Sequence, residues 1–130
     1  MHDRLLLVID DEPLIQAALK RAIRGAGWDY LGAQDGVDGL EIAGEFRPDL
    51  IILDVNMPEM DGRDVLQALK QHPALKEVPV IVITARNDEY TRMTALEAGA
   101  HDVVEKPFDP AMLMRKVAWT LEKEERARAC

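Results

Sequence analysis

Polar side chains that could do chemistry follow four separate apolar runs of the sequence, each at the point where the run ends. They are Asp10 and Asp11 after residues 5–9, Asp54 after residues 50–53, Thr84 after residues 80–83, and Lys106 after residues 103–105. Carboxylates gathered at one place could hold a divalent cation, and one of them could attack phosphorus to form an acyl phosphate. A metal ion and an ammonium group would then offset the charge on the phosphoryl oxygens. The residue types therefore indicate phosphoryl transfer.

Each of these residues has a simpler explanation when it is taken alone. Asp11 before Pro13 could cap a helix, and Thr84 could end a strand. Lys106 with Pro107 could form a surface turn. Capping does not require three anions and one cation to face one point, and a cluster of anions is costly without a counter-ion. The combination therefore predicts a bound divalent cation, and oxygen ligands without a nearby imidazole favour Mg²⁺ over Zn²⁺.

Short apolar runs alternate with segments of helical periodicity along the chain. The runs are rich in Val, Ile and Leu, which is typical of parallel strands buried on both faces. The expected strands are residues 5–9, 28–33, 50–53, 80–83 and 103–104, with 28–33 at an edge of the sheet. The expected helices are residues 13–25, 38–46, 63–71, 89–98 and 110–126.

This alternation predicts an α/β fold with a doubly wound parallel sheet and helices on both of its faces. Right-handed crossovers leave few topologies for such a sheet. Its active groups lie beyond the carboxyl ends of the strands, near the point where the strand order reverses. We expect one domain over residues 1–130, with a core over residues 4–122 and a charged helix end or the start of a linker over residues 123–130.

The composition argues against several classes of protein. The 130 residues fit one domain, and a net charge of −8 argues against nucleic acid as a direct partner. No apolar run approaches the roughly 18 residues of a membrane span, so membrane insertion is not expected. The single cysteine, Cys130, cannot form an internal disulfide, which favours a reducing, cytoplasmic location.

The sequence resembles the receiver domain of bacterial two-component response regulators, in the single-domain form known from chemotaxis. The resemblance extends from about Arg4 to Glu122. The matching stretches are Val8-Ile9-Asp10-Asp11-Glu12, Pro48-Asp49-Leu50-Ile51-Ile52-Leu53-Asp54, Met57-Pro58-Glu59-Met60-Asp61-Gly62, Ile83-Thr84-Ala85, Gly99-Ala100 and Lys106-Pro107-Phe108. Together they form a strong signature, although any one of them alone would be weak.

The resemblance implies a flavodoxin-like sheet of five strands in the order 2-1-3-4-5, with five helices. It implies that Asp54 is the phospho-acceptor, that Thr84 moves inward to hydrogen-bond the phosphoryl group, and that Lys106 pairs with that group. It implies a Mg²⁺ ion held by Asp10, Asp11, Asp54 and the backbone carbonyl of Asn56. The donor would be a histidine kinase or a phosphotransfer protein. The chain would then be no enzyme beyond catalysing its own phosphoryl transfer and dephosphorylation.

One position departs from the family pattern. The residue three before the lysine is often Tyr or Phe, which swings inward with the threonine, and here it is Val103. A branched aliphatic side chain with one torsion cannot act as an aromatic gate. Val103 could equally be a β-branched residue that packs within a strand.

Two other classes of protein share parts of this pattern. A Mg²⁺-dependent phosphatase of the haloacid-dehalogenase type needs a second Asp two residues after the first, and here that residue is Asn56. A pseudo-receiver would act as a phosphorylation-independent binding module. The complete set of Asp, Thr and Lys residues argues against this alternative.

Asn56 and Arg86 stand at positions that flank the path of the attacking water in receivers, so we expect them to set the lifetime of the phosphoryl group. Arg86 is long and could shield the phosphorus or pair with Glu59, or it could be a solvated loop residue. No DNA-binding or enzymatic output segment follows Arg126. The chain is therefore expected either to act alone by docking to a partner or to be a receiver cut from a longer protein.

We expect the signal to leave through the face made by the fourth helix, the fifth strand and the fifth helix. The partner there would be a downstream protein or another copy of the chain. Trp119 lies on the fifth helix, outside the stripe formed by Leu113, Val117 and Leu121. It is either an interaction anchor or a cover for the edge of the core.

Overall fold

Five strands and five helices alternate along the part of the chain that the computed structural model describes, residues 4–57, 61–86 and 88–129. The strands are β1 (Leu5–Ile9), β2 (Asp29–Ala33), β3 (Leu50–Asp54), β4 (Val80–Thr84) and β5 (Asp102–Glu105). The helices are α1 (Pro13–Gly25), α2 (Gly36–Phe46), α3 (Gly62–Gln71), α4 (Glu89–Glu97) and α5 (Pro110–Ala129). The alternation of strands and helices predicted from the sequence is confirmed.

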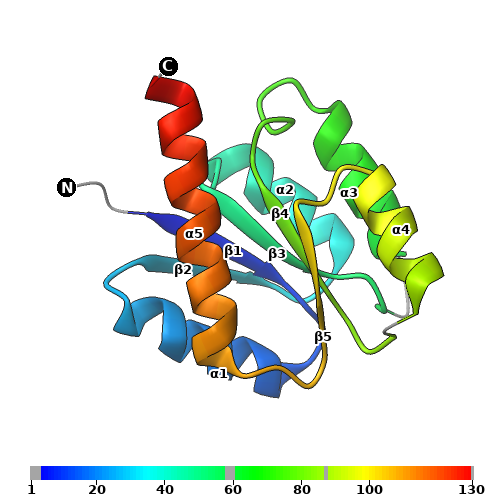
Figure 1. Ribbon diagram of the computed structural model, residues 1–130, viewed down its shortest axis with the longest axis horizontal. Helices are drawn as coiled ribbons and strands as arrows, with labels where there is room; N and C mark the ends of the chain where they lie inside the picture. Colours follow the sequence, from blue (N-terminus) through cyan, green and yellow to red (C-terminus); the bar gives the residue numbers. More distant parts are fainter. Residues whose placement is uncertain (1–3, 58–60, 87, 130) are drawn as a thin grey trace.

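The strands form one parallel sheet in the order β2-β1-β3-β4-β5. The strand order reverses at β1, because the chain first moves outward to β2 and then crosses back to β3 on the other side. Helices α1 and α5 cover one face of the sheet, and α2, α3 and α4 cover the other (Figure 1). The doubly wound, flavodoxin-like fold expected from the sequence is therefore confirmed.

Alternate residues of each strand pack into two separate cores, one on each face of the sheet. In β1, Leu6 and Val8 pack with side chains from α1 and α5. Leu7 and Ile9 of the same strand pack with side chains from α2 and α3. Because helices cover both faces, every residue of β3 is buried, and the strand reads in the sequence as a continuous apolar run that ends in Asp54.

Several element boundaries differ from their predicted positions. Strands β3 and β4 each extend one residue further, into Asp54 and Thr84, because these two residues still pair with the neighbouring strand. Helix α2 begins at Gly36 rather than at residue 38. The reason is that the Asp35 side chain accepts a hydrogen bond from the Asp38 backbone N–H and caps the helix there.

Helix α5 continues beyond residue 126 to Ala129 and is the longest helix, with 20 residues. An ion pair and a side-chain hydrogen bond hold its second half against the rest of the domain. The Arg4 guanidinium lies 2.6 Å from the Glu125 carboxylate, and His101 lies 3.2 Å from Glu124. Among the described residues, no helix combines the length and apolar character needed to cross a membrane.

Candidate functional site

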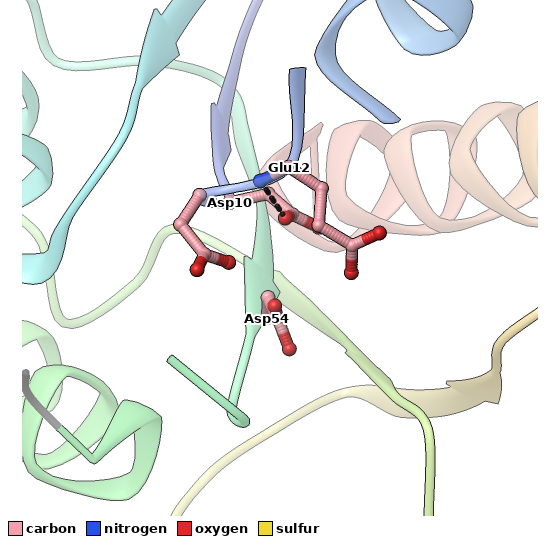
Figure 2. Close-up of side chains that lie close together, drawn as sticks. Asp10, Glu12 and Asp54 are labelled. Atoms are coloured by element: carbon pink, nitrogen blue, oxygen red, sulfur yellow. Dashed lines mark hydrogen bonds between the residues drawn. The ribbon is translucent and has the colours of Figure 1, made fainter. Parts of the chain in front are cut away.

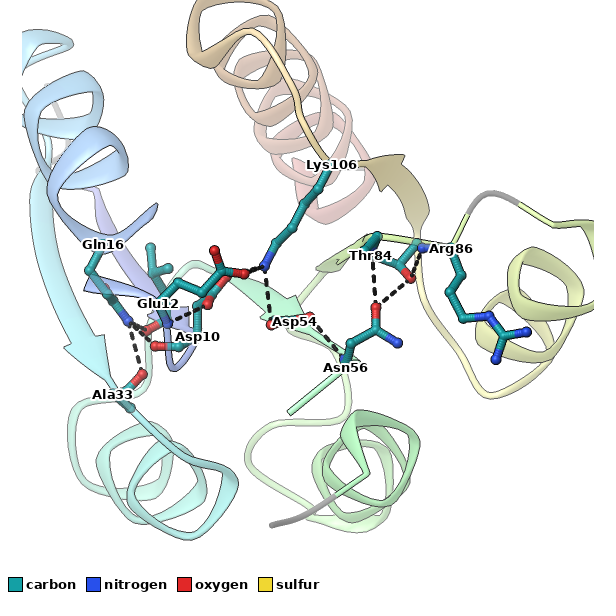
Figure 3. Close-up of polar contacts among 11 residues, drawn as sticks. Asp10, Glu12, Gln16, Ala33, Asp54, Asn56, Thr84, Arg86 and Lys106 are labelled. Carbon is teal, nitrogen blue, oxygen red and sulfur yellow. Dashed lines mark hydrogen bonds and ion pairs between the residues drawn. The ribbon is translucent and has the colours of Figure 1, made fainter. Parts of the chain in front are cut away.

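Four side chains predicted for the site meet at the carboxyl edge of the sheet, two on strands and two directly after them. Asp10 follows β1, Asp54 ends β3, Thr84 ends β4 and Lys106 follows β5 (Figure 3). Parallel strands place all their carboxyl ends at one edge, so residues far apart in the sequence come together there. The structure thus brings together the side chains that the sequence analysis selected at strand ends.

Carboxylates form the centre of this site. Asp10, Asp11, Glu12 and Asp54 each offer one oxygen atom, and these oxygens all lie within 4.8 Å of one another. Figure 2 shows the carboxylates of Asp10, Glu12 and Asp54 directed toward the same space. Asp10 and Asp54 are buried, whereas Asp11 and Glu12 are exposed. Asp11 does not cap α1, because the N-cap residue of this helix is Glu12. The Glu12 side chain makes no capping hydrogen bond either.

Lys106 provides one positive charge for three of these carboxylates. Its Nζ atom lies 2.7 Å from Glu12 Oε1, 3.0 Å from Asp10 Oδ2 and 3.2 Å from Asp54 Oδ2 (Figure 3). The three carboxylates bring more negative charge than one ammonium group can balance. The described side chains therefore leave an excess of negative charge at the site, which a divalent cation would offset.

The pKa values of Asp10 and Lys106 reflect the close approach of these charged groups. Burial raises the pKa of the Asp10 carboxyl, and the negative charge of Asp54 adds to this effect. The Glu12 backbone N–H and the Lys106 ammonium lower this pKa, but the net effect is a rise. Burial by itself would lower the pKa of Lys106, but its close contacts with the Glu12 and Asp10 carboxylates and the charge of Asp54 outweigh this effect and raise that pKa. The Lys106 ammonium therefore stays charged at neutral pH.

The residues present fit a hard divalent cation. Asp10 Oδ2 is buried and, within the described chain, receives no well-directed hydrogen bond, although Lys106 lies within ion-pair distance. A buried carboxylate oxygen with unused lone pairs is costly in a protein and is a suitable metal ligand. The other carboxylates of the cluster provide further oxygen ligands and no nitrogen or sulfur ligand is among them, which suits Mg²⁺.

Asn56 connects the two sides of the site. Its backbone N–H donates to Asp54 Oδ1 at 2.9 Å. Its side-chain oxygen accepts hydrogen bonds from the Thr84 hydroxyl at 2.7 Å and from the Ala85 N–H at 3.0 Å. The sequence analysis selected Asn56 for its backbone carbonyl and for its position, but not for these side-chain contacts, which bridge 28 residues of sequence.

Arg86 extends away from Asp54 (Figure 3), and its guanidinium lies 3.5 Å from the Asp88 carboxylate. Its side chain is 73% exposed. The pairing with Glu59 considered from the sequence lies outside the described residues. The Arg86 side chain is thus solvated in this structure, although its backbone N–H contacts Thr84 in the site.

The Arg86 backbone N–H donates to the Thr84 hydroxyl oxygen at 3.0 Å, so the long side chain begins beside the site and could turn to shield a phosphoryl group on Asp54. On this basis we expect Arg86→Ala to speed the loss of a phosphoryl group roughly 2- to 10-fold, which corresponds to about 0.4–1.4 kcal/mol of barrier. Dephosphorylation would be followed after removal of the phosphodonor. Asp88→Asn is the matched control, since it removes the partner of Arg86 and keeps a side chain that can cap α4. A rate for Arg86→Ala equal to that of the unsubstituted protein would assign Arg86 to the solvated surface.

Sequence reasoning missed two residues of the site, Glu12 and Gln16. From the sequence, Glu12 stood out only as the last residue of a stretch that matches the family, yet it makes the shortest of the three contacts with Lys106. Gln16 Nε2 lies 2.9–3.1 Å from the backbone carbonyl oxygens of Val8, Asp10 and Ala33, which share its two N–H groups. A polar residue between apolar positions on the buried side of α1 was the signal that could have identified it.

Gln16 holds the segment that carries Asp10 against β2, so we expect Gln16→Ala to lower the free energy of unfolding by about 1–3 kcal/mol. Tyr30 donates a hydrogen bond to the Gln16 side-chain oxygen and completes the network. Chemical denaturation measures the loss. The same substitution at Gln67, an exposed position of α3, is the control and should cost under about 0.5 kcal/mol. Equal losses at both positions would contradict a bracing role for Gln16.

The fold and the cluster of polar residues at the strand ends are typical of one class of signalling domain. Comparison with known proteins identifies the same class. Residues 6–118 match the family described as response regulator receiver domain. The chain belongs to this family.

Named relatives and a solved structure show the same likeness. The transcriptional regulatory protein PrrA of Mycobacterium tuberculosis is 42% identical over 118 residues, which is 91% of this chain and 50% of that protein. PhoP of Bacillus subtilis, an alkaline phosphatase synthesis transcriptional regulatory protein, is 35% identical over 95% of this chain and 50% of its own length. A putative response regulator from Chloroflexus aurantiacus, solved by crystallography, superposes with a TM-score of 0.87 at 33% identity, covering 93% of this chain and 99% of that one. The chain spans about half the length of these two regulatory proteins.

Proposed function

We propose that this protein accepts a phosphoryl group on Asp54, in a Mg²⁺-dependent reaction with a histidine kinase or a phosphotransfer protein as donor. The main support is the setting of the Asp54 carboxylate. Lys106 lies 3.2 Å from Oδ2, and the Asn56 backbone N–H donates to Oδ1 at 2.9 Å. A carboxylate held at both oxygens beside one cation and three other carboxylates fits a nucleophile toward phosphorus.

Asp10, Asp11, Asp54 and the backbone carbonyl of Asn56 would hold the Mg²⁺ ion. The ion, when bound, supplies positive charge that offsets the charge on the phosphoryl oxygens. Asp10 suits a ligand role because its Oδ2 atom is buried and has unused lone pairs. Glu12 engages the Lys106 ammonium at 2.7 Å, and this contact orients the lysine across the site.

Lys106 and Thr84 would respond to the new phosphoryl group. Lys106 keeps its charge at neutral pH and can pair with a phosphoryl oxygen beside Asp54. Thr84 is buried at the end of β4, and its hydroxyl can turn to donate to the phosphoryl group. This movement would shift the segment that leads into α4 and so change a partner-binding face.

Intact-mass analysis and peptide mapping after incubation with acetyl phosphate and Mg²⁺ test the proposal. We expect one phosphoryl group per chain, on Asp54. Beryllofluoride with Mg²⁺ should bind at the same residue. Absence of both adducts would instead favour a phosphorylation-independent binding module, the pseudo-receiver alternative.

The proposed output surface is formed by α4, β5 and α5. Tyr90 and Met93 of α4 and Met112 and Trp119 of α5 are all at least half exposed. Trp119 is 58% exposed, which supports the interaction-anchor interpretation over a cover for the core edge, and the Lys123 ammonium lies 4.3 Å from its ring centre. Exposed aromatic and methionine side chains are typical of interface anchors.

Val103 belongs to β5, behind this surface, where it is buried and packs in the core beneath α4. Its burial supports the strand-packing interpretation of this residue. The switch would then depend on Thr84 and the segment after it, without an aromatic partner. A ligand can shift this surface only by its different affinity for the two conformations.

Amide hydrogen exchange with and without beryllofluoride tests this route. We expect changed protection in residues 85–86 and 88–98, which follow Thr84 directly, and in residues 102–119, which begin with strand β5 paired to β4 up to Thr84. Sedimentation of the loaded protein distinguishes a second copy of the chain from a different protein as the partner. Changes limited to residues 54–61 would contradict the route.

The activity proposed here is limited to the chain's own phosphoryl transfer and dephosphorylation, so the protein would not be an enzyme acting on other substrates. We propose that it works in the cytoplasm and reaches a downstream protein target. With a net charge of −8, this domain would not contact nucleic acid itself. Transcriptional control, which the names of PrrA and PhoP state for those proteins, would need a further DNA-binding segment or partner.

A further inference from the structure

The Thr84 hydroxyl has a defined direction in this structure. Its Oγ1 atom lies 3.0 Å from the Arg86 backbone nitrogen and 2.7 Å from Asn56 Oδ1 (Figure 3). The Arg86 N–H can only donate, so the hydroxyl oxygen accepts that hydrogen bond. The single hydroxyl proton is therefore directed at Asn56.

The orientation of the Asn56 amide is also defined. The same atom that faces Thr84 lies 3.0 Å from the Ala85 backbone nitrogen, which can only donate. The atom must therefore be the amide oxygen and not the NH₂ group. Asn56 thus accepts two hydrogen bonds from the end of β4, while its own backbone N–H donates to Asp54.

A hydroxyl group has one proton to donate. Thr84 cannot donate it fully to Asn56 and to a phosphoryl group on Asp54 at the same time. We infer that the Asn56 side chain is a latch: it holds the Thr84 hydroxyl in the orientation that it has before Asp54 is phosphorylated. The strength of this hydrogen bond then sets the free energy needed to turn Thr84 toward the phosphoryl group. This inference rests on the proposed function, because it assigns a positioning role to Asn56 in the same switch.

Loss of the Asn56 latch should lower the free energy needed to turn the Thr84 hydroxyl toward a phosphoryl group on Asp54. A neutral hydrogen bond contributes roughly 0.5–1.5 kcal/mol net, which corresponds to a 2- to 13-fold change in an equilibrium constant. We therefore expect Asn56→Ala to increase the affinity for beryllofluoride in the presence of Mg²⁺ by about this factor. The backbone carbonyl and N–H of residue 56 remain in the variant.

A double-mutant cycle separates a latch from a general structural role. The four proteins are the unsubstituted chain, Asn56→Ala, Thr84→Val and the double variant, and ¹⁹F NMR measures bound beryllofluoride. We expect the gain from Asn56→Ala in the chain with Thr84 and none in the chain with Val at position 84. The same effect in both backgrounds, or no gain in either, would overturn the inference. Asn56→Leu, which also lacks the acceptor oxygen, repeats the test if the alanine variant unfolds.

A second measurement needs neither metal nor phosphodonor. Three-bond couplings of the Thr84 γ-methyl group report its χ1 rotamer in the metal-free protein. We expect one rotamer in the unsubstituted chain and rotamer averaging in Asn56→Ala. An unchanged single rotamer in the variant would contradict the latch even if Asp54 is phosphorylated. Failure of the unsubstituted chain to take beryllofluoride would instead contradict the proposed function.

Discussion

Replacing Asp54 with asparagine should abolish stable phosphorylation by acetyl phosphate. The substitution removes the nucleophilic oxygen and keeps the size and shape of the side chain, so the loss would be complete rather than partial. Every residue of β3 is buried, and Asp54 is its last residue, which places its carboxylate beside Lys106 at the carboxyl edge of the sheet. Intact-mass analysis of the reacted protein measures the effect.

A matched control and a stability measurement accompany this substitution. Asp64→Asn changes an exposed aspartate in the first turn of α3 and should leave the labelling unchanged. In metal-free buffer, Asp54→Asn should be at least as stable as the unsubstituted protein. The reason is that it removes one of three carboxylates that share a single ammonium group. Stoichiometric labelling of the variant would show that Asp54 is not the acceptor.

Millimolar Mg²⁺ should raise the thermal stability of the protein. An ion at about 100 times its dissociation constant contributes roughly 2.7 kcal/mol to the folded state. For a domain of this size that corresponds to a rise in Tm of roughly 5–15 °C. The physical origin is the excess negative charge at the carboxyl edge, together with the buried Asp10 oxygen that receives no well-directed hydrogen bond among the described residues. Melting curves at constant ionic strength measure the shift.

Two variants test which residues cause the stabilisation by Mg²⁺. Asp11→Asn removes an exposed carboxylate of the cluster and should reduce the shift strongly. Asp29→Asn, at the start of edge strand β2, lies at the opposite end of the sheet and should keep the full shift. A shift that Asp11→Asn leaves intact would exclude Asp11 as a ligand, and the absence of any shift in the unsubstituted chain would argue against a metal site.

The order of the elements and the edge at which the functional residues meet follow from the pattern of the amino-acid sequence alone. Continuous apolar runs such as residues 50–53 indicate strands covered on both faces, and the parallel arrangement that follows brings their carboxyl ends together. Asp10, Asp54, Thr84 and Lys106 could therefore be placed at one edge without coordinates. Strand ends were predicted one residue short, because a polar residue was taken as the end of a run whose backbone pairing continues.

Which of these groups are in contact, and how their side chains are oriented, depends on the three-dimensional packing of the chain. Neighbouring residues Asp11 and Glu12 are both acidic and both exposed, yet it is Glu12 that contacts Lys106, 94 residues away. The Asn56 side chain faces Thr84, and the Gln16 amide turns inward to three backbone carbonyls. These contacts depend on side-chain rotamers and on the spacing of segments brought together by the sheet. Hydrophobic periodicity determines which face a residue occupies, but it contains no information on the partner that a polar side chain meets there.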